Sequence, residues 1–408
     1  MKKALVWLLL APLLLLACEN RESPQSRSMA DRYVFRSSDG RPLSDSPRDP
    51  IKINPVSGAA THVCIDPLCS HDSTDCPLFG IQSALVGGDK LYYVTGGLSV
   101  SQYTGEKSGR CEIRSYDMRD GAIDHLASGE NAIVLLGAYR DAVYFMTAIR
   151  EEENERFRYA LFRSDGKKTV ELPLSREYQT VGGGMSTADF PLIYAFDGDR
   201  ILWYAPGENG IDFYATDLNG VMTERFSPAN PRIMNGQYAD GFAYYAAAER
   251  RPEGADEPEA LFRRTNSREI RRCRLDGSGE ATLCGNAAAW ILAGDTIYYT
   301  VLEEEPETFE FNDMKETNWL GGKIYAVGTD GSENRLLCSL EYDLDMTDTK
   351  TFLGALTEDG ATYLCLAFRD YLPNNFYSSG YEYGLSPDTL IVNAATGEIR
   401  IVSAEAGK

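Results

Sequence analysis

The sequence predicts an all-β fold, a β-propeller built from repeats of roughly fifty residues. Two short patterns alternate along the 408-residue chain. One is an aromatic strand that follows a Gly/Asp turn, as in Gly-Asp-Thr-Ile-Tyr-Tyr at 294–299. The other is an apolar strand that ends in an Asp-Gly type of turn, as in 324–331. Turn dipeptides between β-rich runs are strong hairpin signals, and regular self-similarity favours a propeller over a sandwich pair or a solenoid.

Each pattern occurs seven times. The aromatic copies are at 33–35, 91–93, 143–145, 201–204, 242–245, 297–299 and 362–364. The hairpin copies are at 51–58, 113–121, 159–166, 213–220, 270–277, 324–331 and 390–397. These copies predict seven four-stranded antiparallel blades, with six or eight as alternatives. Little sequence precedes Tyr33 or follows the last strand at 398–402. The first blade should therefore have three strands, unless residues 22–30 close the ring.

The order of the two patterns predicts where the connections lie. With strands A to D counted outward from the axis, the aromatic strand is B, and the Asp-Gly type of turn joins C to D. Neighbouring aromatic residues then point to opposite faces of a sheet that is covered on both sides. The long insertions fall between B and C, at 96–110, 150–156, 250–268, 302–322 and 369–387. They should gather at one end of the ring, where a rigid scaffold would present them for function.

The N-terminus has the layout of an export signal. Lys2 and Lys3 precede an apolar run at 4–16 that is too short to span a membrane comfortably. The run ends in Leu-Leu-Ala-Cys at 15–18, which resembles the lipobox of bacterial lipoproteins. The resemblance implies cleavage before Cys18 and a diacylglycerol on its thiol; a plain secretory signal is the alternative. We therefore expect a signal peptide at 1–17, a lipidated Cys18 with a flexible tether at 18–30, and a propeller domain at 31–408.

Charge and missing motifs exclude several functions. The formal net charge is −21, and loss of Lys2 and Lys3 with the signal would make it −23. Nucleic acid is excluded as a partner because binding phosphates needs a basic face. The sequence holds three histidines and no G-x-S-x-G, S-x-x-K, H-E-x-x-H or P-loop motif. No catalytic residue is predicted. The acidic runs at 151–155 and 303–307 are interpreted as solvated loops.

One dense group of soft ligands stands out. Cys64, Cys69, His71 and Cys76 are spaced C-x4-C-x-H-x4-C. Three thiols and an imidazole suit a tetrahedral zinc site, which would be structural because four protein ligands fill the coordination sphere. A disulfide with one spare thiol and three unpaired thiols are the alternatives, and His62 is a substitute ligand. As a D–A connection, this loop is expected at the same end as the insertions.

The insertion at 369–387 is dense in aromatic and amide residues. Rings with polar tips suit sugar or peptide binding, and a self-packed loop is the alternative. The candidate ligand-binding residues are Tyr371, Asn374, Asn375, Phe376, Tyr377, Tyr381 and Tyr383.

The combination of lipobox, Tyr-Tyr strands and Asp-Gly hairpins resembles a group of bacterial surface lipoproteins with TolB-like propeller repeats and no assigned activity. A recurrent stretch of that group looks like the one here at Cys64, Asp66, Pro67, Cys69, His71, Cys76 and Pro77. The resemblance implies a propeller anchored by lipid outside the cytoplasm. We expect a binding or scaffold module whose ligand, a glycan, peptide or protein, sits on the insertion-bearing face. The alternative is a lyase or hydrolase that uses carboxylates around the central channel.

Overall fold

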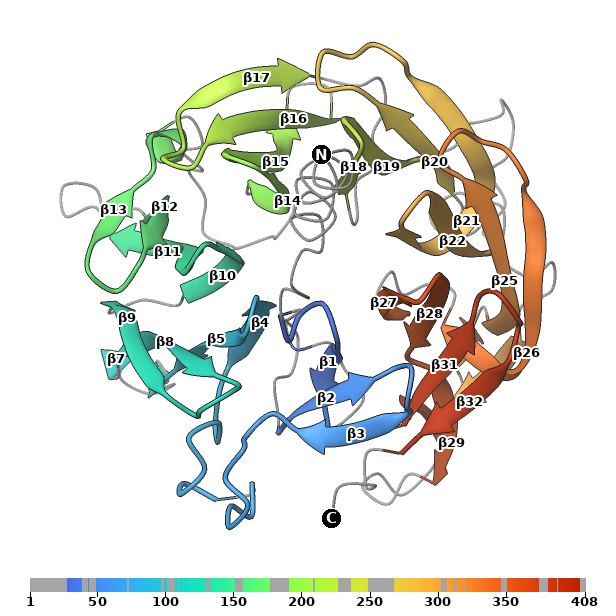
Figure 1. Cartoon of the computed structure of the whole chain (residues 1–408), viewed down its shortest axis with the longest axis horizontal. Helices are drawn as coiled ribbons and strands as arrows, with labels where there is room; N and C mark the ends of the chain where they lie inside the picture. Colours follow the sequence, from blue (N-terminus) through green and yellow to red (C-terminus); the bar gives the residue numbers. More distant parts are fainter. Residues whose placement is uncertain are drawn as a thin grey trace, which may run out of the picture.

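The structure is a computed structural model in which antiparallel sheets stand in a ring around a central axis (Figure 1). It describes residues 28–38, 43, 49–71, 73–96, 99–100, 107–108, 110–129, 133–150, 157–176, 191–207, 210–226, 236–248, 268–301, 307–311, 314–318, 320–345, 351–373, 381–386 and 388–403. Within these ranges, no helix has the length and apolar character needed to cross a bilayer.

Four sheets have four strands each, in sequence order from the axis outward. The first holds β4 (Ser83–Gly87), β5 (Lys90–Thr95), β8 (Cys111–Asp117) and β9 (Ile123–Gly129). The second holds β10 (Ile133–Tyr139), β11 (Ala142–Arg150), β12 (Phe157–Ser164) and β13 (Thr169–Glu171), followed by the 3-10 helix η1 (Pro173–Arg176). The third holds β14 (Leu192–Asp197), β15 (Arg200–Gly207), β16 (Gly210–Asp217) and β17 (Met222–Phe226). The fourth holds β27 (Phe352–Glu358), β28 (Ala361–Leu366), β31 (Thr389–Asn393) and β32 (Ile399–Val402).

The other sheets differ in strand number. The sheet nearest the N-terminus has three strands, β1 (Val34–Ser37), β2 (Pro50–Asn54) and β3 (Ala59–His62). Counted around the ring, it is called the first sheet below, and the sheet of β4, β5, β8 and β9 is called the second sheet. A continuous seven-stranded sheet contains β18 (Gln237–Ala239), β19 (Phe242–Ala248), β20 (Arg268–Cys273), β21 (Ala281–Ala293), β22 (Thr296–Val301), β25 (Leu320–Gly328) and β26 (Arg335–Asp345). Three two-stranded hairpins are β6 (Ser99–Val100) with β7 (Lys107–Ser108), β23 (Glu307–Phe311) with β24 (Met314–Asn318), and β29 (Arg369–Pro373) with β30 (Tyr381–Leu385).

The predicted all-β propeller with antiparallel four-stranded blades is confirmed. In the four-stranded sheets the aromatic pattern forms the second strand, and the Asp-Gly type of turn joins the third strand to the fourth. The expected three-stranded first blade is also present as β1–β3. The sheets do not separate into seven, because β21 pairs with β20 on one side and with β22 on the other.

Short hairpins join the first and second strands of each four-stranded sheet, and the same kind of turn joins β18 to β19 and β21 to β22. In the β21–β22 hairpin, Ala293 pairs with Thr296, so Gly294 and Asp295 form a two-residue loop, with φ of +62° at Gly294. Glycine tolerates this left-handed backbone without a Cβ penalty, which explains the Gly-Asp signal. The β10–β11 loop places Arg140 and Asp141 at φ of +48° and +60° with no glycine.

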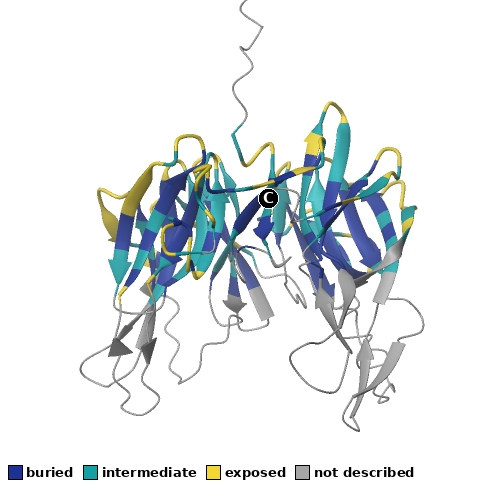
Figure 2. Ribbon diagram, turned by 90° about the horizontal axis from the view of Figure 1, so that it is seen from below, coloured by how far each residue is buried: buried dark blue, intermediate teal, exposed yellow. Residues whose placement is uncertain are grey.

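The core lies between neighbouring sheets. Tyr298 and Tyr299 are adjacent in β22, yet each contributes to a different buried cluster. Tyr298 packs toward Phe352 and Leu364 of the next sheet, and Tyr299 packs with Tyr244 of the preceding strands. Alternation of side chains along a strand causes this division. Buried residues fill the sheets, and exposed residues collect at the turns of one end (Figure 2).

Side-chain packing closes the ring where the β1–β3 sheet meets the β27–β32 sheet (Figure 1). Val34 and Ile53 of the first sheet share a core cluster with Cys365, Ile391 and Val402 of the last one. Arg400 adds hydrogen bonds from its guanidinium to the carbonyl oxygens of Pro55 and Val56, the latter at 2.6 Å. The described strands at the two ends share no sheet, so this closure needs no strand exchange.

Candidate functional site

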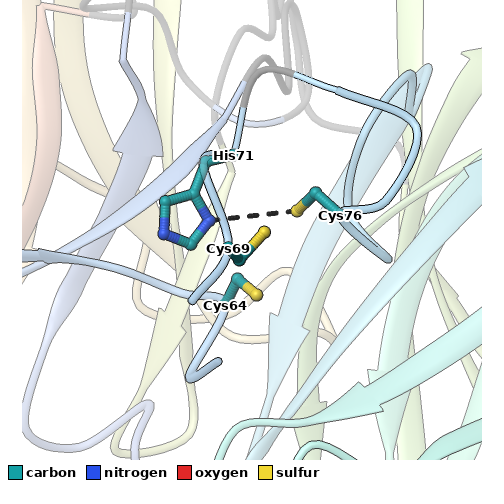
Figure 3. Close-up of side chains that lie close together, drawn as sticks. All are labelled: Cys64, Cys69, His71 and Cys76. Carbon is teal, nitrogen blue, oxygen red and sulfur yellow. Dashed lines mark hydrogen bonds between the residues drawn. The ribbon is translucent and has the colours of Figure 1, made fainter. Parts of the chain in front are cut away.

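The connection between β3 and β4 brings the predicted soft ligands together (Figure 3). Cys64, Cys69, His71 and Cys76 each offer one ligand atom, and these four atoms lie within 4.8 Å of one another. Cys76 Sγ is 3.9 Å from His71 Nδ1. No cysteine within the described ranges forms a disulfide. The geometry therefore joins all four side chains that the spacing singled out.

Local turns hold the loop in this shape. The Asp66 carboxylate accepts a hydrogen bond from the Leu68 N–H at 2.9 Å, and the Asp66 carbonyl accepts one from the Cys69 N–H at 3.2 Å. The Cys76 N–H donates to the Ser73 carbonyl at 3.0 Å. Asp side chains commonly bond to backbone two residues on, so Asp66 explains how the chain turns between the first two thiols. His71 has φ of +63°, a conformation in which histidine is enriched among non-glycine residues.

Burial controls the protonation of two of the thiols. Cys64 and Cys76 are buried, and both belong to the core between the first and second sheets. Burial raises the pKa of the Cys64 thiol, and it raises the pKa of Cys76 to about 12. A thiolate is penalised in such surroundings unless a nearby cation compensates its charge. At neutral pH these side chains are therefore neutral thiols in the absence of a cation.

A second pair of residues supports the histidine. His62 Nδ1 lies 2.8 Å from Asp49 Oδ1. The His62 ring stacks on His71, with ring centroids 4.0 Å apart and planes 19° apart. An imidazole binds a metal through a lone pair in the plane of its ring, so two rings stacked in this way do not converge on one ion. His62 is thus placed as a neighbour of His71, although Asp49, His62 and His71 also group within 4.8 Å.

A pocket of about 1160 Å³ adjoins the cluster. Its walls come from the first sheet, including Lys52 and Thr61, and from the loop that carries the thiols, including Phe79. Asp49, His62 and His71 also line it, so the imidazoles border this space.

The cluster lies at the outer edge of the ring, between the first two sheets (Figure 1). The Ile65 N–H donates to the Tyr116 hydroxyl at 2.9 Å, and a Cβ on Gly121 would lie 3.5 Å from the Ile65 side chain. Gly121 belongs to the β8–β9 turn, at the end of the ring opposite the insertions. The expectation that this loop gathers with the insertions is therefore wrong. Because each strand of a twisted sheet is rotated relative to the one before it, the outermost strands are tilted with respect to the direction of the ring axis. The end of β3 therefore meets the β8–β9 turn.

The other predicted sites fall mostly outside the described residues. These include Cys18 and the central part of the aromatic insertion, Asn374, Asn375, Phe376 and Tyr377. Tyr371, Tyr381 and Tyr383 lie on the β29–β30 hairpin, where Tyr371 pairs with Tyr383 and Tyr381 pairs with Pro373.

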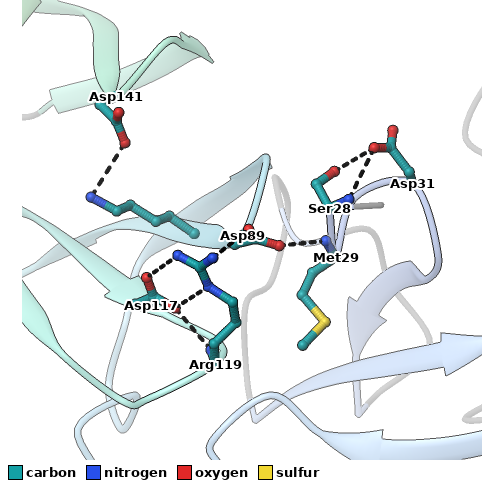
Figure 4. A network of polar contacts seen from close by, with 8 residues as sticks. Ser28, Met29, Asp31, Asp89, Asp117, Arg119 and Asp141 are labelled. Atoms are coloured by element: carbon teal, nitrogen blue, oxygen red, sulfur yellow. Dashed lines mark hydrogen bonds and ion pairs between the residues drawn. The ribbon is translucent and has the colours of Figure 1, made fainter. Parts of the chain in front are cut away.

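Sequence reasoning missed the docking of the first described residues (Figure 4). The Ala30 N–H donates to the Gly88 carbonyl at 2.9 Å, and the Met29 N–H donates to Asp89 Oδ1 at 2.7 Å. Arg119 forms an ion pair of 3.2 Å with Asp89 and one of 3.1 Å with Asp117. Gly88-Asp89 has the same form as the turns at 198–199 and 294–295, so no local signal distinguishes it.

Among known proteins, the chain is similar to several solved structures. No family model and no curated protein matches the chain. An Agrobacterium tumefaciens protein assigned as TolB is 13% identical over 76% of this chain and 89% of its own, with a TM-score of 0.37. The β-propeller domain of the Trilobed protease from Pyrococcus furiosus is 13% identical over 78% and 83%, with a TM-score of 0.43. An uncharacterised Listeria monocytogenes protein is 10% identical over 90% and 94%, with a TM-score of 0.42. The propeller assignment rests on the sheets and their connections.

Proposed function

We propose that this chain is a lipid-anchored, extracytoplasmic β-propeller that works as a binding or scaffold module. One observation carries the proposal. Each of the hairpins β6–β7, β23–β24 and β29–β30 is inserted between a strand of the aromatic pattern (β5, β22 or β28) and the next strand of the same sheet (β8, β25 or β31). Antiparallel order puts these insertions at one end of the ring, opposite the short turns. Elaborated connections on a rigid scaffold are where binding residues concentrate.

The docking of residues 28–33 supports an orientation for this module. Met29 and Ala30 bond to the Gly88-Asp89 turn, at the end opposite the insertions. The chain from Cys18 to residue 27 spans at most about 35 Å when fully extended. Wrapping that tether outward past four strands and down a blade would need a similar length, about 35–40 Å. An anchor at Cys18 therefore favours an orientation in which the end of the ring with the short turns faces the membrane. The end with the insertions then faces away from it.

The ligand class is argued from the β29–β30 hairpin. It carries Tyr371 opposite Tyr383 and Tyr381 opposite Pro373, and the sequence between its two strands contains Asn374 to Tyr377. Tyrosine and asparagine supply ring surface and hydrogen-bonding groups together, which suits an oligosaccharide or a peptide. We propose that this hairpin contributes to the ligand site.

Anchoring is tested by fractionating a bacterial host that expresses the full chain. The parent protein should partition with membranes, and Cys18→Ala should appear in the soluble extracytoplasmic fraction or uncleaved. Cys365→Ala, which removes a buried thiol elsewhere, is the control and should stay with membranes. Membrane association of a cleaved Cys18→Ala protein equal to that of the parent would contradict lipidation, since only an uncleaved signal could otherwise hold the variant at the membrane.

Binding is tested on an oligosaccharide array and a random-peptide array with the chain from residue 18 carrying Cys18→Ser. We expect at least one array ligand to be bound by this protein and lost when residues 369–387 are replaced by a short Gly-Ser connection. Asp276→Ala and Asp330→Ala, in the turns of the opposite end, should keep that binding. Retention of every ligand by the 369–387 variant, or no ligand on either array, would reject the proposed site.

The channel-centred enzyme finds no favouring observation. It would need carboxylates that converge from several inner strands. The described inner strands, β4, β10, β14, β18, β27 and the second half of β21, carry two, Asp197 and Glu358. Both are at the last position of their strand, and Asp197 is paired with Arg200. We therefore propose no second function.

We also infer that the ring has seven blades. The continuous sheet would count as two, with β21 supplying the outer strand of one and the inner strand of the next. The register of β21 with β22 shifts between Ala287 and Trp290, and Ala287 is also the last residue of β21 that pairs with β20. A break in pairing at this point supports a division of the seven strands into two blades.

A further inference from the structure

We propose that Cys64, Cys69, His71 and Cys76 bind one Zn²⁺, and that this ion clasps the three-stranded sheet to its neighbour. The inference does not depend on the proposed binding function, because it concerns how the ring is held together.

The donor set identifies the ion. Thiolate sulfur and imidazole nitrogen select zinc among the common divalent cations, whereas calcium and magnesium prefer oxygen ligands. Zn–S bonds of about 2.3 Å place tetrahedral sulfur atoms about 3.8 Å apart. The four donors here lie within 4.8 Å of one another, and one S···N separation is 3.9 Å. The cluster thus needs a contraction of about 1 Å or less to close around the ion.

The convergence of four donors favours a metal over a disulfide. A disulfide would use two sulfur atoms, and it would not account for a third thiol and the His71 imidazole lying within 4.8 Å of them. Cys64 and Cys76 are nearly fully buried, so each thiolate needs the positive charge that zinc supplies. Four protein ligands leave no open position for substrate, so the ion has a structural role.

The surroundings explain what the ion would hold. Cys64 and Cys76 share a buried cluster with Leu91, Tyr93 and Tyr116 of the second sheet. The segment itself continues directly from β3 of the first sheet. A four-stranded sheet would offer its neighbour one more strand of contact than β1–β3 does. The β3–β4 connection with its zinc ion therefore adds a contact between the first and second sheets at the outer edge of the ring. Met29 and Ala30 make another contact with the second sheet at the β4–β5 turn.

Metal analysis tests the assignment. The chain from residue 18 with Cys18→Ser, purified with reductant and without chelator, should contain about one zinc per molecule. Cys69→Ser and His71→Ala should lose most of the zinc after dialysis against a mild chelator. Cys284→Ala is the matched control, since it removes a buried thiol outside the cluster, and it should keep one zinc. His62→Ala should also keep it, because His62 stacks on His71. Loss of zinc from His62→Ala with retention in His71→Ala would overturn the ligand set.

The clasp is tested on the parent protein, so a variant that fails to fold does not decide the outcome. Stripping zinc with a strong chelator should increase hydrogen exchange in peptides from 59–95, and it should leave 192–226 in the third four-stranded sheet unchanged. Adding Zn²⁺ back should restore protection. Protein purified without reductant that contains no zinc, and in which two of the three cluster thiols resist alkylation until they are reduced, would reject the site in favour of a disulfide. Zinc loss without any change at 59–95 would reject the clasp.

Discussion

The backbone N–H of Met29 donates a 2.7 Å hydrogen bond to Oδ1 of Asp89, across sixty residues of sequence. The other carboxylate oxygen of Asp89 pairs with Arg119, so one side chain joins the entering chain to two turns of the second sheet (Figure 4). This contact fixes the end of the ring from which the chain enters.

Asp89→Ala should loosen the entering segment. Loss of a charged acceptor for a part-buried N–H costs about 1–2 kcal/mol, so amides 30–37 should exchange faster and proteases should cut near 28–33. Asp199→Ala is the control, because Asp199 occupies the same turn position and pairs with the exposed Arg140. Equal protection of 30–37 in the parent and Asp89→Ala would contradict this role.

Two glycines separate backbone strain from crowding. Gly294 has φ of +62° and no atom within 4 Å of an added Cβ, so Gly294→Ala should destabilise the protein by about 1–2 kcal/mol. Gly277 has φ of +81°, and its added Cβ would lie 2.5 Å from the Phe226 ring. Gly277→Ala should cost about 2–4 kcal/mol, because overpacking is added to strain. Urea unfolding measures the loss of stability in each variant. A smaller loss for Gly277→Ala than for Gly294→Ala would show that the Phe226 side chain moves aside freely.

The Trp203 indole allows a test of how much stability is lost when a buried N–H loses its hydrogen-bond acceptor. Trp203 is fully buried, and its Nε1–H donates to Thr216 Oγ1 at 2.9 Å. Thr216→Val leaves this donor unpaired and should destabilise the protein by about 1–3 kcal/mol. Thr223→Val removes a part-buried hydroxyl that donates to Ala215, and the loss should be smaller. Chemical unfolding monitored by fluorescence measures both. Equal losses would show that burial of the indole N–H is not what matters.

Asp117 should make part of the stability pH-dependent. The Arg119 guanidinium, with lesser help from Lys90, lowers the pKa of the Asp117 carboxyl, and Asp89 and Asp120 are the other charged neighbours of Arg119. A lowered folded-state pKa means that the stabilisation is present above the unfolded value, near 3.9, and is lost as the pH falls through the folded one. Asp117→Asn should therefore be less stable than the parent at pH 7, and the difference should disappear as the pH falls through the lowered folded-state pKa of Asp117. A difference that persists at low pH would point to hydrogen bonding in place of charge.

The sequence by itself determined the strand repeat, because each of its signals is local. Tyr298-Tyr299 predicts a strand covered on both faces, and Gly294-Asp295 predicts the tight turn before it; both depend on backbone conformation and alternation alone. The spacing of Cys64, Cys69, His71 and Cys76 likewise suffices to nominate one loop as a soft-ligand cluster.

Tertiary structure decided where these pieces meet. The twist of the outer strands carries the cysteine loop to Tyr116 and Gly121, away from the insertions, and twist accumulates over a whole sheet. His62 stacks on His71, and the Met29 N–H bonds to Asp89. In neither pair does the local sequence around one residue indicate the other as its partner. Such contacts depend on packing between sheets, so the local patterns that fix strands and turns do not contain them.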